Sequence, residues 1–332
     1  AESDLRLTTL YNRSKKELGT DVIEFEIPVR VISDENNLVK RELILSSIAA
    51  GLKPVKWFQM SVKGSILDSD LVIDNPIDPG AVSQNFFFMD TDETRFSGEI
   101  QTDFLISDLP AARQVMDVIT TGLLFEREEA DAELQGLLID LILGPNSISS
   151  IRSKRENRAY YIQNLFKIED RFTLQGGARL DYNSDFGSII NPKVSSSYII
   201  SPTDTKIRAG WGKGFRAPSI QEIRFPFFGN PNLDPERSTS YEIGLDQWFF
   251  SRETTLSATY FYISIKDLIQ AGPAGIDNIG KATSKGVELE TSLKPFESLR
   301  LRVNYTYFKA EDSATGEELP FRSKNKWYLN LL

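Results

Sequence analysis

The sequence contains neither cysteine nor histidine. Without cysteine there is no disulfide framework, no thiolate ligand for zinc and no thiol nucleophile. Without histidine, Ser-His-Asp triads, zincin motifs and the usual proton shuttle near neutral pH are also excluded. Carboxylate, lysine and tyrosine chemistry is what the sequence leaves for catalysis.

Long apolar runs and excess positive charge are missing as well. No run of about 18 apolar residues occurs, so the sequence predicts no transmembrane helix. The formal net charge is −9, which argues against a nucleic-acid-binding surface because no basic stripe is available to neutralise phosphates. The first residues, AESDLRLTTL, lack the charged start and apolar core of a signal peptide. We therefore expect that a signal was removed or that the chain is a fragment.

The sequence has instead many segments in which apolar and polar residues alternate. In Arg95–Ser107 the apolar residues occupy every second position, with Leu105 as the exception, and Phe172–Tyr182 is equally regular. Alternation over a dozen residues exceeds the five or six that are typical of soluble strands. It suits tilted strands that cross a bilayer, which bulk hydropathy does not detect.

These segments group into hairpins, and we count about 15 strands. Near the N-terminus, Ile23–Val31 is expected to form one strand and Glu42–Leu67 a hairpin that turns at Lys53-Pro54. Further along, the expected hairpins pair Ala159–Ile168 with Arg171–Tyr182, Lys193–Ser201 with Lys206–Phe215, Arg237–Phe249 with Thr254–Lys266, and Ala282–Leu293 with Leu299–Lys309.

The expected connections alternate in length. Tight turns are predicted at Pro110, Glu169, Pro202, Ser251 and Pro295, and longer connections at 128–154, 183–191, 216–235, 267–279 and 311–320. Short turns on one side and long loops on the other are typical of outer-membrane barrels, whose long loops are extracellular. A soluble sandwich has no reason to keep that alternation.

One segment breaks the strand pattern. Between Ala130 and Ser153, apolar residues recur at helical spacing, and Gly144-Pro145 would end the run. We expect a short amphipathic helix inside a long loop. The alternative is a poorly patterned strand.

The stretch Gly212–Gln247 organises the rest of the chain. It joins two alternating runs through a loop rich in proline, glycine and asparagine. Loops of this length in compact proteins are usually functional.

The same stretch carries a family resemblance. Gly214–Pro218 (GFRAP) and Gly229–Glu236 (GNPNLDPE) resemble the C-terminal barrel signature of TonB-dependent outer-membrane receptors. Tyr260–Ile269 (YFYISIKDLI) and Asn278–Glu290 (NIGKATSKGVELE) fit the same family in the same order. The resemblance covers roughly residues 93 to 332.

The resemblance implies an all-β fold, an antiparallel transmembrane β-barrel in the cell outer membrane. Plugged transporters of this kind have about 22 strands, so we expect residues 1–332 to be a partial barrel domain that lacks the plug. By resemblance, the intact protein binds a scarce nutrient such as a siderophore, haem, cobalamin or a glycan. The TonB complex would supply energy through the missing plug. No enzyme activity, cofactor or nucleic-acid partner is implied, and the lipid bilayer is the expected environment.

Two sets of candidate site residues follow from this reading. The extracellular loop offers a cation, aromatic rings and amides to a ligand, at Arg224, Phe225, Phe227, Phe228, Asn230 and Asn232. The alternative is that the prolines and asparagines of the signature only shape the loop. The second set is expected to face the lumen and the plug, at Glu99, Asp103, Arg179, Asp181, Arg208, Glu242 and Glu288. The alternative for these residues is the solvated face of a soluble sheet.

Catalytic and metal sites find little support. The adjacent pairs Glu128-Glu129 and Glu317-Glu318 have no converging partners, and the acidic run at Asp90–Glu93 lacks calcium-loop spacing. We therefore expect no catalytic and no metal site. The rival interpretations are a soluble or secreted all-β binding or adhesion protein and, more weakly, a β-rich glycan hydrolase.

Overall fold

The computed structural model describes most of the chain. The described residues are 2–17, 20–24, 30–34, 38–75, 87–106, 115–136, 140, 143–144, 147–224, 229–250, 253–272, 275–296, 299–319 and 322–331.

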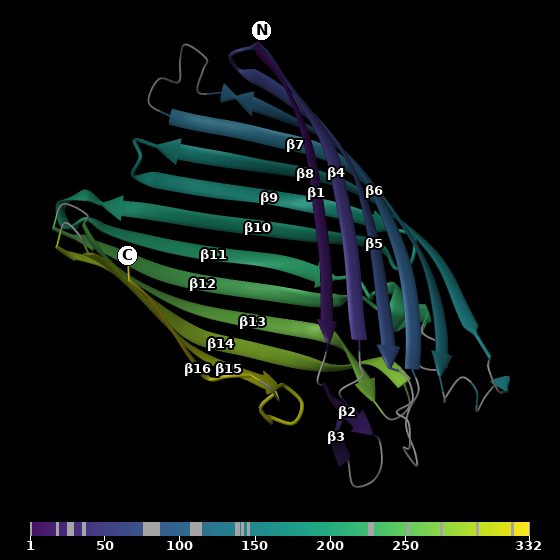
Figure 1. Cartoon of the computed structure of the whole chain (residues 1–332). Coiled ribbons are helices and arrows are strands. Elements are labelled where there is room, and N and C mark those ends of the chain that lie inside the picture. Colours follow the sequence, from purple (N-terminus) through teal and green to yellow (C-terminus); the bar gives the residue numbers. More distant parts are fainter. Residues whose placement is uncertain are drawn as a thin grey trace.

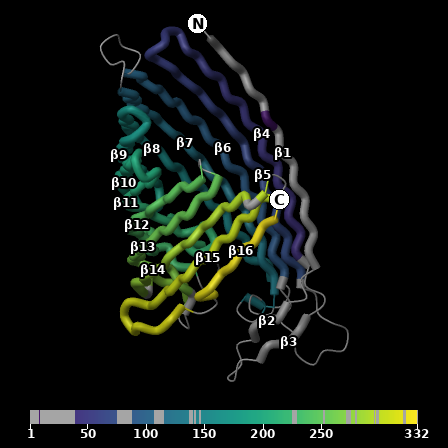
Figure 2. Tube along the Cα trace, turned by 90° about the vertical axis from the view of Figure 1, so that its left-hand side faces the viewer, coloured from purple at the N-terminus to yellow at the C-terminus, as the bar shows by residue number. Residues whose placement is uncertain are grey.

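One antiparallel sheet of 14 strands dominates the fold (Figure 1). In this sheet β1 pairs with β4, each strand from β4 onward pairs with the next one along the chain, and β1 and β16 lie at the two ends of the strand order. The strands are β1 (Glu2–Glu17), β4 (Leu38–Val55), β5 (Phe58–Asn75), β6 (Phe87–Leu105), β7 (Val115–Gly136), β8 (Ser149–Ile168), β9 (Phe172–Asn183), β10 (Gly187–Ile200), β11 (Thr205–Arg216), β12 (Glu236–Phe249), β13 (Thr254–Gly272), β14 (Gly275–Phe296), β15 (Leu299–Asp312) and β16 (Asn325–Leu331). The all-β, antiparallel fold class that the sequence predicts is confirmed, and Figure 2 shows the sheet curved into a trough.

A separate two-stranded hairpin lies between β1 and β4. It consists of β2 (Thr20–Glu24) and β3 (Arg30–Asp34), paired with each other. The prediction of a single strand over Ile23–Val31 is therefore wrong: the alternating run is divided between two strands. Pro28 lies outside the described residues.

The two faces of the sheet differ sharply. One face, which we call the outer face, exposes aliphatic and aromatic side chains such as Leu174, Tyr241, Ile243 and Leu245, with Ile243 56% exposed. The opposite, inner face carries the charged and polar residues that alternate with them along the same strands. A soluble sandwich would bury the apolar face against a second sheet. Exposed apolar strands of this length match a membrane wall.

The connections follow the expected alternation only in part. We call the edge of the sheet with the connections at 56–57, 169–171, 201–204 and 250–253 the turn end, and the opposite edge the loop end. The loop end carries the long connections at 76–86, 137–148, 217–235 and 313–324. The predicted longer connections at 183–191 and 267–279 are wrong: β9 and β10 are joined by 184–186 alone, and β13 and β14 continue as paired strands to Gly272 and Gly275.

The predicted helix between Ala130 and Ser153 is wrong at both ends of that segment. Residues up to Gly136 belong to β7 and residues from Ser149 belong to β8, and these strands pair as far as Leu134 and Ser149. Only Asp140 and Leu143 are described as helical. Leu134, the first leucine of the helical spacing, is a strand residue and is 1% exposed. The other four residues of that spacing, Leu137, Leu138, Leu141 and Ile142, lie outside the described residues.

Within the described residues, no helix has the length and apolarity needed to span a membrane. The α-helix α2 (Ile220–Arg224) lies in the connection between β11 and β12. Its Ile223 is buried and it packs toward β8. The long loop therefore leans back over the inner face of the sheet.

Candidate functional site

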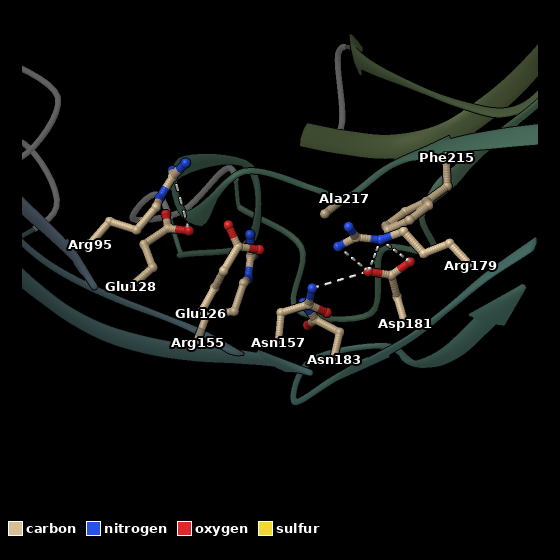
Figure 3. Close-up of a pocket in the computed structure, with 10 residues that line it drawn as sticks. All are labelled: Arg95, Glu126, Glu128, Arg155, Asn157, Arg179, Asp181, Asn183, Phe215 and Ala217. Atoms are coloured by element: carbon tan, nitrogen blue, oxygen red, sulfur yellow. Dashed lines mark hydrogen bonds and ion pairs between the residues drawn. The ribbon is translucent and has the colours of Figure 1, made fainter. Parts of the chain in front are cut away.

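A charged pocket of about 380 Å³ opens on the inner face, near the loop end of β6 to β9 (Figure 3). It lies where the connection from β11 to β12 turns back toward β8. Its lining residues come from the neighbouring strands β6 to β9, from the end of β11 and from that connection: Arg95, Glu126, Glu128, Arg155, Asn157, Arg179, Asp181, Asn183, Phe215 and Ala217.

The floor of the pocket is an ion pair within strand β9. Arg179 and Asp181 are two positions apart, so they lie on the same face of the strand. The Arg179 Nε lies 3.0 Å from both carboxylate oxygens of Asp181, and Nη2 lies 2.8 Å from Oδ1. The Asn157 Nδ2 donates to the same Oδ1 over 3.1 Å. Asp181 is 1% exposed, so its negative charge is buried and neutralised by fixed donors.

Arg155 ties three parts of the chain together. It lies on β8 beyond the last pair with β9, and its side chain is 9% exposed. Its Nε donates to Asp185 in the turn from β9 to β10 over 2.7 Å, and its Nη2 donates to the Pro218 carbonyl oxygen over 2.7 Å. The β9–β10 hairpin ends at Asn183 and Gly187, short of the loop end of β8. The space beyond it allows the β11–β12 loop to contact β8.

The remaining acidic side chains are less fully paired. Arg95 Nη2 lies 2.9 Å from Glu93 and 3.6 Å from Glu128. Among the described residues, Glu126 forms no ion pair and the buried Asn157 Oδ1 accepts no hydrogen bond. The pocket therefore offers fixed cations together with carboxylate and amide acceptors that a polar guest can use.

The loop is held at its start by a charged cluster. Arg216 donates to Glu222 over 2.9 and 3.1 Å and to Glu236 over 2.7 Å. Ser219 and Glu222 form a reciprocal capping box at the start of α2, with Ser219 N to Glu222 Oε2 at 2.7 Å and Glu222 N to Ser219 Oγ at 3.2 Å. Partial burial pushes the pKa of Glu222 upward, but the hydrogen bonds from Arg216 and Ser219 outweigh it and lower the pKa below its ordinary range.

The far side of the loop is pinned to the β13–β14 hairpin. Asp234 N donates to Asn278 Oδ1 over 2.8 Å, and Asn278 Nδ2 donates to the carbonyl oxygens of Asp234 and Asp267 over 2.9 and 2.7 Å. Glu236 also accepts from the Ile269 amide over 3.0 Å. Pro218 and Pro235, at the two ends of the connection, are both fully buried. The family-like motif residues thus bond mainly to one another.

The predicted ligand contacts divide into three groups. Arg224 is exposed at the end of α2. Phe225, Phe227 and Phe228 lie outside the described residues. Asn230 Oδ1 accepts from the Asn232 amide over 2.9 Å, and Asn230 Nδ2 lies 3.4 Å from Asp277. Ligand contact by these residues stays a prediction.

The residues predicted to face the lumen and plug all lie on the inner-face positions of their strands. Glu99 accepts from the Tyr161 hydroxyl over 2.7 Å, and Asp103 accepts from Thr120 over 2.6 Å. Arg179 and Asp181 form the pocket floor, whereas Arg208 bonds Thr259 and lies 3.4 Å from Asp246. Their contact with a plug also stays a prediction.

Glu242 and Glu288 lie together at a second, wider inner-face pocket of about 570 Å³. That pocket also includes Phe261 and Phe308, whose rings stack 6.3 Å apart. Sequence reasoning did not single out Arg155 or Glu126. The alternation did contain a signal for both residues. Arg155 is an even number of positions from Tyr161 on β8, and Glu126 is two positions from Glu128 on β7, so each lies on the same face as its partner in this comparison.

Within the described ranges, no group of three or more acidic side chains is placed to hold a metal ion. The acidic run Asp90–Glu93 lies in strand β6, where successive side chains alternate between the two faces.

Comparison with known proteins agrees with this architecture. Residues 65–331 match the family model described as TonB dependent receptor-like, beta-barrel. Over 190 residues the chain is 30% identical to the vitamin B12 transporter BtuB of Photobacterium profundum, covering 54% of this chain and 30% of that protein. Over 199 residues it is 31% identical to an iron-regulated outer membrane virulence protein of Vibrio cholerae, covering 51% of this chain and 30% of that protein.

A solved structure shows the same fold. The ferric citrate transporter FecA in its unliganded form superposes with a TM-score of 0.75 at 14% identity, covering 99% of this chain and 52% of that one. The chain thus spans about a third of the length of the curated relatives named above.

Proposed function

Because the chain belongs to the TonB-dependent receptor family, whose barrel model it matches over residues 65–331, we propose that the protein takes up a scarce small nutrient across the outer membrane. The nutrient binds on the extracellular side and is released inward. The single observation that carries this proposal is the charged inner-face pocket beside a loop that is held by hydrogen bonds near both of its ends.

Two substrate classes have support from the relatives. One relative is named as a vitamin B12 transporter and another as an iron-regulated outer-membrane protein. An iron–siderophore complex or a cobalamin is therefore the proposed cargo. Both are polar molecules too large for simple diffusion, and mixed cationic and acceptor groups such as those of the pocket suit their peripheral carboxylates, amides and hydroxyls.

The loop supplies the first contact in this proposal. Exposed Arg224 and the aromatic residues Phe225, Phe227 and Phe228 would meet the ligand, while Asn230 and Asn232 would orient the loop. A pinned loop loses less conformational entropy on binding than a free one, so its anchors raise affinity without touching the cargo.

Energy coupling and plug contact complete the proposal. The TonB complex would act on an N-terminal plug that fills the trough. Inner-face charges, including Glu99, Asp103, Glu126 and Glu242, would contact polar groups of that plug. The apolar outer face would contact lipid.

Uptake by whole cells tests the proposal. Cells that lack their own receptors for cobalamin and ferric siderophores are supplied with the full-length protein and with one radiolabelled cargo at a time. We expect energy-dependent accumulation of one cargo, abolished by a protonophore although surface binding continues. Accumulation equal to that of receptor-free cells for every cargo would contradict the proposal.

The loop contribution is tested in the same assay. Arg224→Ala is expected to weaken cargo binding roughly tenfold, because a charge-assisted hydrogen bond contributes about 1.5–3 kcal/mol. Arg158→Ala, an exposed arginine on the outer face of β8, is the matched control and is expected to change binding less than twofold. Equal effects of the two variants would exclude Arg224 from the ligand site.

A further inference from the structure

Three basic residues are direct neighbours across three strands of the outer face. In the strand register Arg237 of β12 lies opposite Lys266 of β13, and Lys266 lies opposite Lys281 of β14. All three side chains are exposed. Directly opposed residues have Cβ atoms about 4.5–5.5 Å apart, and like charges at that spacing are destabilising. A row of three cations therefore calls for an anion from outside the chain.

Within the described part of the chain, no acidic side chain forms an ion pair with any of these three cations. The side chains of Arg237, Lys266 and Lys281 form neither an ion pair nor a hydrogen bond with any described residue. Lys285 extends the row along β14 and lies opposite Lys309 of β15, which is paired with Glu311. The positive charge is thus concentrated at the loop end of β12 to β14.

The row lies just beyond the apolar surface. Toward the turn end, the same face of β12 and β13 carries Tyr241 and Tyr262, whose rings lie 6.4 Å apart, and then Ile243 and Tyr260. Aromatic residues at this position mark the level where the hydrocarbon ends and headgroups begin. The cations therefore lie at the depth of the headgroups of the extracellular leaflet.

The loop-end parts of β7 and β8 are built differently. There each outer-face cation has an acidic neighbour: Arg127 pairs with Glu129, Arg152 with Asp131 at 2.7 Å, and Lys154 with Glu156 at 3.2 Å. Basic residues at the loop end are therefore not unpaired as a rule. The excess positive charge is specific to β12 to β14.

We propose that Arg237, Lys266 and Lys281 form a binding site for the phosphate groups of an outer-leaflet glycolipid. The phosphates would lie between the three cations while the acyl chains of the same lipid cover Tyr241, Tyr260 and Ile243. Each juxtaposed cation contributes to attraction of a lipid anion, and the apolar surface below it adds the selectivity for a lipid over a free ion. This site is distinct from the nutrient pocket, which lies on the opposite face of the sheet.

Binding of a defined lipid tests the site. The protein is purified in detergent from outer membranes, and its affinity for diphosphorylated lipid A is measured by native mass spectrometry. The test variant combines Arg237→Gln, Lys266→Gln and Lys281→Gln. The matched control combines Arg127→Gln, Arg152→Gln and Lys154→Gln, and a charge-conserving variant combines Arg237→Lys, Lys266→Arg and Lys281→Arg. Heat-modifiable migration on a gel verifies that each variant is folded.

We expect the test variant to bind lipid A about a hundredfold more weakly, since each basic residue contributes about 1 kcal/mol at a membrane surface. The matched control should stay within about threefold of the parent, and the charge-conserving variant should bind as the parent does. Dephosphorylated lipid A should bind the parent as weakly as it binds the test variant, and inorganic phosphate at equal concentration should not compete.

Three results would contradict the proposed lipid site. One is unchanged lipid A binding by the folded test variant. Another is an equal loss in the matched control, which would indicate general surface charge. The third is competition by inorganic phosphate at equal concentration, which would indicate a free-anion site.

Discussion

The ring of Tyr161 on β8 occupies the space that a side chain at position 122 of β7 would need. Gly122 is the direct cross-strand partner of Tyr161, and the Tyr161 hydroxyl donates to Glu99 on β6 over 2.7 Å. The same arrangement recurs on the inner face where Arg208 lies over its partner Gly244. Large inner-face side chains thus lie flat across a neighbouring strand, and glycine gives them room.

Replacing Gly122 with valine should destabilise the protein. The new side chain would collide with the Tyr161 ring and break its hydrogen bond to Glu99, at a cost of about 1–3 kcal/mol. Thermal unfolding in detergent measures the loss. Gly98→Val is the matched control, because a Cβ at position 98 meets nothing within 4 Å. Equal Tm values for the two variants would contradict the flat-lying arrangement.

Asp181→Asn should weaken the pocket floor. The substitution keeps the shape but leaves Arg179 without its counter-charge in a half-buried site, at a cost of about 1–3 kcal/mol. Urea unfolding of the detergent-solubilised protein is the measurement. The control is Asp131→Asn, whose ion pair with Arg152 is exposed and contributes less than about 1 kcal/mol. A larger effect at position 131 would refute the assignment of Asp181 as the structural anion.

Asn278→Ala should release the β11–β12 loop from the β13–β14 hairpin. The side-chain oxygen and nitrogen of Asn278 both form hydrogen bonds with the loop or the adjacent turn, and alanine removes all three of these bonds. Hydrogen exchange of the Asp234 amide should become faster by roughly tenfold, since a hydrogen bond contributes about 1 kcal/mol. Gln270→Ala on the same hairpin should leave it unchanged. Slow exchange in the Asn278 variant would show that other contacts hold the loop.

Acid should loosen the start of the same loop through Glu222. Its pKa in the folded protein is lower than its ordinary 4.5, so the unfolded state binds more protons there. The stabilisation is fully present above pH 4.5 and is lost as the pH falls through the folded pKa. Proteolysis by an acid-active protease should therefore begin in the loop at low pH. Glu222→Gln should be cleaved at every pH at which the protease is active, and a parent loop that resists down to pH 2 would contradict this mechanism.

Alternation and turn residues were enough to predict most of the sheet. The outer-face positions of Leu174, Ile243 and Leu245 follow from period two alone, because one residue of slip would exchange the two faces. The family membership followed from GFRAP and GNPNLDPE, whose residues prove to be a connected hydrogen-bond network around Arg216 and Asn278.

The parts that sequence reasoning missed depend on three-dimensional contact. Leu134 belongs to an apolar run with helical spacing, yet its cross-strand pairing with Ser149 of β8 places it in a strand. The contact between Arg155 and the Pro218 carbonyl joins residues 63 positions apart, and it exists because the β9–β10 hairpin is short. No local sequence pattern indicates that a short hairpin will leave space for a distant loop to contact β8.

The central claim is that this sheet is the wall of an outer-membrane barrel, with its outer face in lipid. Because the chain lacks cysteine, single cysteines at Ile243 and Glu242, adjacent on β12, can each carry a spin label in the protein reconstituted into bilayers. We predict that the label at position 243 collides with dissolved oxygen and is shielded from a water-soluble nickel complex, and that the label at position 242 shows the reverse. Equal access of the nickel complex to both labels would contradict the membrane-wall account.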